Sequence, residues 1–297
     1  MTPAGRFAPS PSGELHVGNL RTAILAWLFA RSTGRRFLLR VEDLDRARAG
    51  AEAVQLRDLA AIGVGWDGDV IRQTARGALY DDTISRLQSA GLTYECFCTR
   101  REIQEAPSAP HAPQGAYPGT CRNLDAAELE YKRSTRPAAI RLRAELAEYT
   151  VHDVLHGAYT GAVDDFVLRR NDGVTAYNLA VVVDDAEQGI DQVVRGDDLL
   201  PSTPRQAYLA TLLDIPVPEY AHVPLVVNSD GARLAKRDGA VTLSDLGARG
   251  VSAAEVRNIL LASLGLPPGT LEAALGAFSP AALPREPWVW KEAVNIH

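Results

Sequence analysis

Cysteine is scarce in this sequence, and long apolar runs are missing. Only three cysteines occur among 297 residues, a number too low for the disulfide framework of a secreted protein. No apolar run approaches the roughly 20 residues that span a bilayer. A signal peptide begins with a basic stretch followed by an apolar segment, and the first residues of this sequence do not show that pattern. These absences predict a protein of the reducing cytoplasm that does not enter a membrane.

An excess of basic residues is also missing. The chain has 31 Lys and Arg against 37 Asp and Glu, a formal net charge of -6, which is unlike the overall basicity of many nucleic-acid-binding proteins. RNA is not excluded as a partner, because binding requires only a local basic face. A hydrophobic fraction of 46% over this length predicts one large or two modest domains with a sizeable core.

The first candidate site lies at residues 6–19. A short apolar strand is followed by a turn with two prolines and a glycine, and then by a helix with apolar residues at helical spacing. The first N–H groups of a helix have no partner within it and lie at the positive end of its dipole, so they can bind phosphate. His16 and Asn19 add donors, and Gly18 lets a ligand approach the backbone. The alternative is an ordinary strand-turn-helix with a solvated histidine.

The next elements predict an α/β fold built on a doubly wound, Rossmann-like parallel sheet. Residues 36–42 contain an apolar run typical of a strand buried on both faces, and strand, helix and strand in succession imply a right-handed crossover. Ligands of such sheets bind beyond the carboxyl ends of the strands, where residues 10–13 and 42–45 fall.

The rest of the chain continues this alternation, apart from a Pro-, Ala- and Gly-rich loop expected at 106–119. Helices are expected at 51–62, 78–87, 203–213 (capped by Ser202 or Thr203), 244–249 and 253–264; strands at 136–143, 149–154, 166–170, 190–195 and 220–227; and a core strand or helix at 175–184.

Three charged residues stand next to apolar strands. Arg6 and Arg195 each lie at a strand end, and such a pair of arginines suits recognition of a carboxylate. Glu42 follows another apolar strand and can take an ammonium group. The alternative is a structural ion pair between these residues.

A second phosphate-type site is the basic segment 233–239. Arg233, Lys236 and Arg237 place three cations in five residues after a predicted strand and turn. Cations in such a loop can hold a polyphosphate while it leaves. A solvated basic loop is the alternative.

All three cysteines lie in one segment. Cys96 and Cys98 are two residues apart, and Cys121 lies across the Pro/Gly-rich loop, so the three thiols can converge on zinc. Zinc takes four ligands, and the fourth is either Tyr117 or His111. Three unrelated buried thiols would be the alternative.

Together these features resemble the class I glutamyl-tRNA synthetase family over about residues 6–264. Ala235 departs from the family pattern, since a serine is usual there. Two signatures in order, with linking blocks, are more specific than either signature alone. The matching segments are 6–19, containing the HIGH-like His16-Val17-Gly18-Asn19; 233–237, which is similar to the KMSKS signature; and the blocks 40–45 and 194–200.

The resemblance implies that glutamate attacks the α-phosphorus of ATP to give glutamyl-adenylate and pyrophosphate, with Mg²⁺ bound largely through the nucleotide. It makes His16 and Lys236 the catalytic residues. His16 would contact the ATP phosphates, and Lys236 would hold the departing pyrophosphate. It implies a glutamate pocket of Arg6, Ala8, Ser10, Glu42, Tyr177 and Arg195, and an ATP site of Pro9, His16, Gly18, Asn19, Arg233, Leu234 and Lys236.

Within the family, three features resemble the glutamyl-Q tRNA(Asp) synthetases, which attach glutamate to queuosine, the modified wobble nucleoside of tRNA(Asp). The chain stops soon after the KMSKS-like segment, which predicts that a large anticodon-binding portion is lacking. Val181 stands where glutamyl-tRNA synthetases typically have Asn. Cys96, Cys98, Tyr117 and Cys121 look like the structural zinc site of this subgroup.

The resemblance also implies a domain plan and leaves two other functions open. A short glutamyl-tRNA synthetase that charges the tRNA 3′ end would share the adenylate chemistry. A non-catalytic paralogue that binds RNA or protein is favoured by Ala235. The domain plan is a catalytic domain at 1–93 and 172–242, a zinc-containing lobe at 94–171 and a helical segment at 243–297. The protein is expected to be a monomer.

Six arginines are candidates for the surface that binds tRNA. The alternative is that they form a solvated face. They are Arg100, Arg101, Arg122, Arg169, Arg170 and Arg205.

Overall fold

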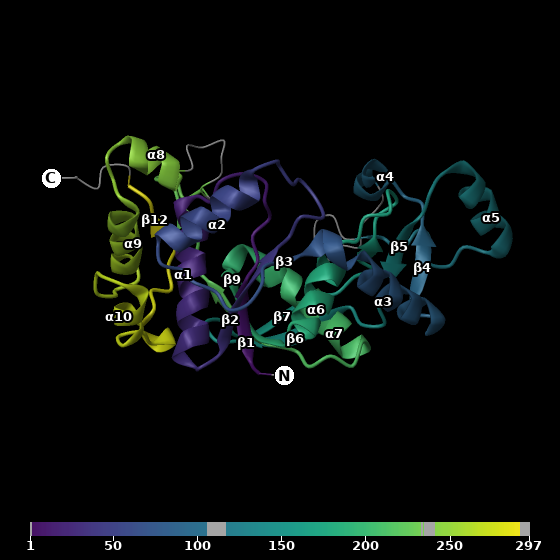
Figure 1. Cartoon of the computed structure of the whole chain (residues 1–297). Helices are drawn as coiled ribbons and strands as arrows, with labels where there is room; N and C mark the ends of the chain where they lie inside the picture. The colour runs from purple at the N-terminus through teal and green to yellow at the C-terminus, as the bar shows by residue number, and fades with distance from the viewer. Residues whose placement is uncertain (1, 106–116, 233, 235–240, 292–297) are drawn as a thin grey trace.

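A seven-stranded sheet forms the centre of the computed structural model, which describes residues 2–105, 117–232, 234 and 241–291 (Figure 1). Its neighbouring strands are parallel, except for the antiparallel pair at one edge. Across the sheet the order is β3 (Ile71–Arg72), β2 (Arg36–Val41), β1 (Ala4–Phe7), β9 (Ile190–Gly196), β10 (Glu219–Val223), β6 (Glu148–Asp153) and β7 (Gly157–Ala162).

The chain order reverses between β1 and β9. From β1 the chain moves outward through β2 to β3, and β9 and β10 continue on the other side. The predicted α/β fold with a mainly parallel sheet is therefore confirmed. The carboxyl ends of β1 and β9 lie at the switch point where ligands of such sheets bind. The helices between these strands are α1 (Val17–Ser32), α2 (Ala51–Ala61), α3 (Gly77–Ser89), α6 (Tyr177–Glu187) and α7 (Thr203–Leu212), with the 3₁₀ turns η1 (Gln73–Arg76) and η2 (Asp197–Ser202).

Helix α1 is buried on almost every side. Its apolar residues belong to the largest core cluster, with the sheet on one side and the C-terminal helices on the other (Figure 1). A helix covered on both sides needs no continuous polar stripe, which explains the unbroken apolar run at 23–30. The C-terminal elements are α8 (Leu243–Ala248), α9 (Ala253–Ala262), α10 (Leu271–Leu275), η4 (Pro280–Ala282) and β12 (Trp288–Val289).

A separate three-stranded antiparallel sheet lies at the end of the molecule opposite the C-terminal helices (Figure 1). Strands β6 and β7, which fall inside the range 94–171 expected for the inserted lobe, are instead added to the large sheet, where Asp153 pairs with Tyr220. The lobe therefore takes only part of that range. Its elements are β4 (Thr93–Cys96), α4 (Arg100–Glu105), α5 (Ala126–Thr135), β5 (Ala139–Leu142) and β8 (Val167–Arg169).

Two local predictions were wrong. The strand expected at 220–227 ends at Val223, because Pro224 has no N–H for the ladder, and it resumes as β11 (Val226–Val227), which pairs with β12. Ser202 does not cap α7, because η2 runs directly into the helix and leaves Ser202 in helical conformation (φ -87°, ψ -18°). The ambiguous segment 175–184 is the start of α6. No helix in the described part of the chain is long and apolar enough to cross a membrane.

Candidate active site

The N-terminus of α1 is closed by its own residues. His16 is the N-cap, and its Nδ1 accepts hydrogen bonds from the backbone N–H groups of Gly18 (3.1 Å) and Asn19 (3.3 Å). The side chain of Asn19 accepts from the N–H of His16 at 3.3 Å. The N–H of Val17 donates to the carbonyl of Val241 at 3.0 Å. These amides are therefore paired within the chain, which differs from the expectation that they bind phosphate.

Gly18 also leaves room for the His16 side chain. A Cβ at residue 18 would lie 3.0 Å from the His16 ring, so the glycine accommodates the imidazole, and its predicted contact with ATP stays a prediction. Because Nδ1 accepts, the neutral ring carries its proton on Nε2. Any phosphate contact of His16 would accordingly be made by Nε2–H.

The basic segment 233–239 falls mostly outside the described residues. Arg233, Lys236 and Arg237 are among those not described, so their predicted contacts with ATP stay predictions. Leu234 is buried, with its N–H 3.3 Å from the carbonyl of Val226. On the other side of the segment, Val241 is bonded to the first residue of α1. Leu234, within the KMSKS-like segment, and Val241, which follows it, are thus joined to the core.

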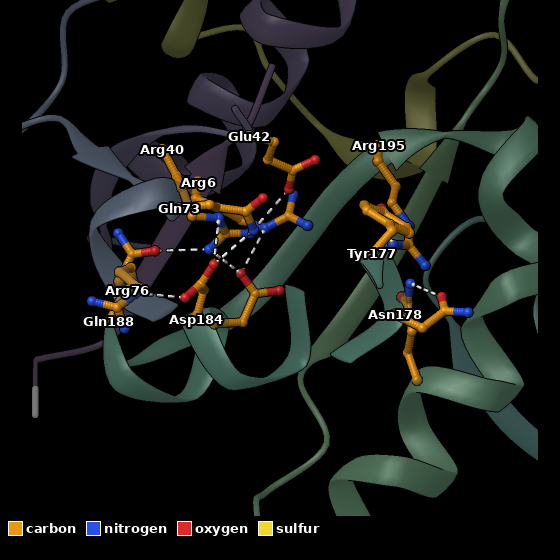
Figure 2. Close-up of polar contacts among 12 residues, drawn as sticks. Arg6, Arg40, Glu42, Gln73, Arg76, Tyr177, Asn178, Asp184, Gln188 and Arg195 are labelled. Carbon is orange, nitrogen blue, oxygen red and sulfur yellow. Dashed lines mark hydrogen bonds and ion pairs between the residues drawn. The ribbon is translucent and has the colours of Figure 1, made fainter. Parts of the chain in front are cut away.

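Arg6 and Arg40 belong to a buried charge network on the face of the sheet covered by α6 (Figure 2). Asp185 accepts from Nη1 of Arg40 at 2.7 Å and from Nε of Arg6 at 3.3 Å. Burial alone would raise the pKa of Asp185, but the two guanidinium groups outweigh it and hold the pKa below its usual range. Asp184, the neighbouring residue, accepts from Gln73, Arg76 and Tyr80.

Glu42 lies at the open side of this network. Its carboxylate is 3.5 Å from Nη2 of Arg40, and its N–H donates to the carbonyl of Pro9 at 3.0 Å. Burial raises the pKa of Glu42, and the positive charges of Arg40 and Arg6 oppose the shift without cancelling it. A cationic group next to Glu42 would stabilise its charged form. Glu42 does form a structural ion pair. Its partner is Arg40, whereas the sequence suggested Arg6 or Arg195.

Arg195 is held differently, by neutral groups. Its Nε donates to His222 (3.0 Å), its Nη1 to the hydroxyl of Tyr177 (3.3 Å) and its Nη2 to the hydroxyl of Thr203 (2.9 Å). Nη1 of Arg6 lies 3.4 Å from the carbonyl of Val194, which places the two predicted arginines on adjacent strands. Figure 2 shows Tyr177 and Arg195 together, beside the Arg6 network.

A cleft of about 880 Å³ connects these residues with the antiparallel lobe. Ser10, Glu42 and Tyr177 line it on the side of the large sheet, and Cys98 and Arg136 on the side of the lobe. The turn 8–13 is fixed by Gln55, whose amide donates to the carbonyls of residues 10 and 13 at 3.0 and 2.6 Å. The cleft has room for a large substrate above the predicted glutamate pocket.

The three cysteines converge in the lobe, where their sulfur atoms lie within 4.8 Å of one another. The phenol oxygen of Tyr117 is 3.3 Å from Sγ of Cys96 and 3.7 Å from Sγ of Cys98. The guanidinium of Arg141 lies 3.7 Å from the centre of the Tyr117 ring. Burial raises the pKa of Cys98 to about 12, and a bound cation would reverse that shift. His111, the alternative fourth ligand, lies outside the described residues.

Several arginines considered for tRNA are engaged with carboxylates. Arg122, Arg169 and Arg205 pair with Asp165, Asp81 and Asp164, respectively, and Arg170 pairs with Asp45 and Asp172. The carboxylates that pair with Arg169 and Arg170 are exposed. Such pairs contribute roughly 0–1 kcal/mol, so a phosphate could replace the carboxylate there. The partners of Arg122 and Arg205 are largely buried.

Sequence reasoning missed Asp185, Asp153 and His222, which hold the predicted arginines in place. Asp185 follows the apolar run at the start of α6, and His222 lies in the apolar strand β10, two residues after Tyr220. A polar residue in an apolar run is a signal that the sequence provides. The sequence does not show which residue it pairs with, because the pairing depends on which strands are neighbours.

The chain is similar to known proteins over nearly its whole length. The family of class I tRNA synthetases (E and Q), catalytic domain, matches residues 4–275. A glutamyl-Q tRNA(Asp) synthetase from Nocardia farcinica is 67% identical over 96% of this chain and 92% of its own length. Another from Cutibacterium acnes is 54% identical over 89% of this chain and 76% of its own length.

Solved structures agree with this assignment. The crystal structure of a glutamate tRNA ligase from Elizabethkingia meningosepticum in complex with its amino acid superimposes with a TM-score of 0.82 and 26% identity. The match covers 98% of this chain and 67% of that chain. On these grounds the chain belongs to the class I glutamyl- and glutaminyl-tRNA synthetase family and, within it, to the glutamyl-Q tRNA(Asp) synthetases.

Proposed function

We propose that the protein activates L-glutamate with ATP and transfers it to the queuosine of tRNA(Asp). The observation that carries this proposal is the 67% identity, over 96% of the chain, with a glutamyl-Q tRNA(Asp) synthetase. The arginines and the carboxylate at the switch point of the sheet support it, because they are complementary to an amino acid with two carboxylates and an ammonium group. In this proposal a single chain in the cytoplasm carries the activity.

In the glutamate pocket, Arg195 and Arg6 bind carboxylate and Glu42 binds the ammonium group. The raised pKa of Glu42 supports this role, because an incoming cation would compensate the cost of its buried charge. The hydroxyl of Tyr177 orients Arg195, and Ala8 and Ser10 complete the wall of the pocket. Arg6 shares Asp185 with Arg40, so we assign the larger part of carboxylate binding to Arg195.

We assign the ATP site to the start of α1 and the KMSKS-like segment, with Pro9, Gly18, Asn19, Arg233 and Leu234 as the residues that contact the nucleotide. ATP enters as its Mg²⁺ complex. The α-carboxylate of glutamate attacks the α-phosphorus, the bond to the bridging oxygen breaks, and pyrophosphate leaves. Nε2–H of His16 donates to the phosphate oxygens, and Lys236 holds the pyrophosphate.

In the second step, a hydroxyl of the queuosine cyclopentene ring attacks the carbonyl carbon of the adenylate. AMP leaves, and an ester joins glutamate to the nucleoside. The cleft between the glutamate pocket and the lobe supports this step, because it offers room for a nucleoside above Glu42 and Tyr177.

We propose that the lobe is held together by one structural zinc ion. The fit is chemical: three thiols and a phenol oxygen converge at distances a tetrahedral ion can bridge with small movements. Cys96, Cys98 and Cys121 would supply thiolates, with Tyr117, or else His111, as the fourth ligand. The ion has no part in the transfer.

The test is transfer of labelled glutamate to two tRNA pools that differ only in queuosine. Label is expected only in the queuosine-containing pool, and ribonuclease digestion should locate it in the anticodon loop. Equal labelling of both pools, located at the 3′ end, would establish the short glutamyl-tRNA synthetase instead. No label together with no pyrophosphate exchange would leave the non-catalytic paralogue.

A further inference from the structure

A row of buried polar side chains runs from the glutamate pocket across the sheet. Arg195 lies on β9, His222 is its register partner on β10, and Asp153 ends β6, the next strand. Nε of Arg195 lies 3.0 Å from Nε2 of His222, and Nδ1 of His222 lies 2.6 Å from Oδ2 of Asp153. All three side chains are at most 5% exposed. Only the first of them was predicted to touch a substrate.

The row fixes the tautomer of His222. Asp153 is held in place by the N–H groups of Leu155, His156 and His222, at 2.8 to 3.0 Å. Burial alone would raise its pKa, but these bonds and the His222 side chain outweigh burial, so the pKa lies below its usual range. A carboxylate can only accept, so Nδ1 of His222 carries the proton and Nε2 presents a lone pair to Arg195.

His222 is also kept neutral. Burial lowers its pKa, the hydrogen bond to Asp153 opposes the shift, and the charge of Arg195 adds to it, with a net lowering. Protonation at Nε2 would place an N–H donor against the N–H of a guanidinium. The neutral form is thus the one that fits Arg195.

The neutrality of the partners distinguishes Arg195 from Arg6. Asp185 partly cancels the charge of Arg6, whereas His222, Tyr177 and Thr203 accept from Arg195 without carrying a negative charge. These contacts use three of its five N–H groups. Among the described contacts, one N–H on each terminal nitrogen is left for a ligand, which is the arrangement that binds a carboxylate with two parallel hydrogen bonds.

We propose that His222, locked in one tautomer by Asp153, is a positioning residue that orients Arg195 for the carboxylate of glutamate without neutralising it. A carboxylate at residue 222 would orient Arg195 equally well but would compete with the substrate. An apolar residue would leave Nε without an acceptor and the guanidinium held only by Tyr177 and Thr203. This inference rests on the proposed function, since the ligand is taken to be glutamate.

Two substitutions separate the two hydrogen bonds of His222. In His222→Asn, the amide can still donate to Asp153, but the side chain is too short to reach Arg195. In His222→Gln, the longer side chain can place its carbonyl oxygen near the former Nε2 and accept from Arg195. The matched control is His152→Asn, at an exposed position of β6.

The measurement is glutamate-dependent pyrophosphate exchange by the full chain, with the KM for glutamate, the KM for ATP and kcat determined separately. We expect His222→Asn to raise the KM for glutamate by about 10-fold or more, because loss of a hydrogen bond to a charged group misplaces the main carboxylate ligand. The KM for ATP should stay within about 2-fold. His222→Gln should recover most of the loss, and His152→Asn should behave as the unchanged protein.

Each outcome is decisive. An unchanged KM for glutamate in His222→Asn overturns the inference, as does an equal rise in the KM for ATP, which would indicate a general loss of structure. Equal defects in the Asn and Gln variants also overturn it, because the acceptor would then not be what matters. Absence of exchange in the unchanged protein overturns the proposed function itself, and with it this inference.

Discussion

Asp185→Asn removes the negative charge that Arg6 and Arg40 share. Both guanidinium groups are buried, at 4% and 0% exposure, and Asp185 lies 3.3 and 2.7 Å from them. Removal of one partner from a buried ion pair costs about 3–5 kcal/mol, because the other charge stays buried and uncompensated. Asparagine keeps one carbonyl acceptor, so we expect a loss of free energy of unfolding near the lower limit, about 3 kcal/mol.

The assay is thermal and urea unfolding followed by circular dichroism. A loss of this size should lower Tm by about 6 °C or more in a chain of this length. Glu95→Gln is the matched control, since Glu95 pairs with Arg133 at 2.7 Å but on the surface, with side-chain exposures of 28% and 51%. An exposed pair contributes about 0.2–1 kcal/mol. If Asp185→Asn cost no more than Glu95→Gln, the argument from the buried network would be refuted.

The pH dependence provides a second check on Asp185. Its pKa is lower in the folded chain than the value of about 3.9 expected when unfolded. The stability it contributes is therefore complete above pH 4 and is lost as the pH falls through the lowered pKa. The difference in unfolding free energy between the unchanged protein and Asp185→Asn should accordingly shrink in acid, and a difference that grows there would contradict the assignment.

Four further predictions address the site. Glu42→Gln should raise the KM for glutamate at least about 10-fold, and the KM of the unchanged protein should already rise in acid at a pH above the ordinary carboxylate pKa of about 4.3, because burial raises the pKa of Glu42. Cys98→Ser should lower bound zinc, measured by atomic emission, well below one ion per chain; unchanged metal content would favour buried thiols. Lys236→Ala should abolish pyrophosphate exchange with an unaltered circular dichroism spectrum, and a normal exchange rate would exclude its role. Gly18→Ala should push the His16 ring out of place, since the new Cβ would lie 3.0 Å from it; exchange kinetics matching the unchanged protein would show that the ring adapts.

Local patterns were sufficient to predict most of the elements that form the site. The apolar run of β2, the turn after β1 and the spacing in α1 each depend on neighbours in sequence, and the strand carrying Arg195 was recognised in the same way. The Cys cluster was recognised from spacing alone and does converge. The start of α6 at Tyr177 could not be told from a strand, because a buried apolar run has no diagnostic period.

Partners of buried charges could not be predicted. Arg40 was recognised only within a matching block, yet it is completely buried and joins Glu42, Asp184 and Asp185. Those contacts depend on α6 packing against the sheet at β9, an arrangement that no local pattern contains. For the same reason β6 was assigned to the lobe, since its place depends on pairing with β10. Strand β7, which pairs with β6, was missed.

The place of Asp184 and Asp185 in the chain bears on synthesis of the protein by the ribosome. Strands β1 and β2, with the helix between them, emerge first, and they carry Arg6 and Arg40 into positions that become fully buried. The two aspartates that compensate these cations are translated about 140 residues after Arg40. Until then, closure of the N-terminal half would bury two cations with Glu42 as their only nearby carboxylate among the residues already made, which is strongly unfavourable. We therefore expect the nascent N-terminal half to stay open, and a target for chaperones, until α6 has left the ribosome.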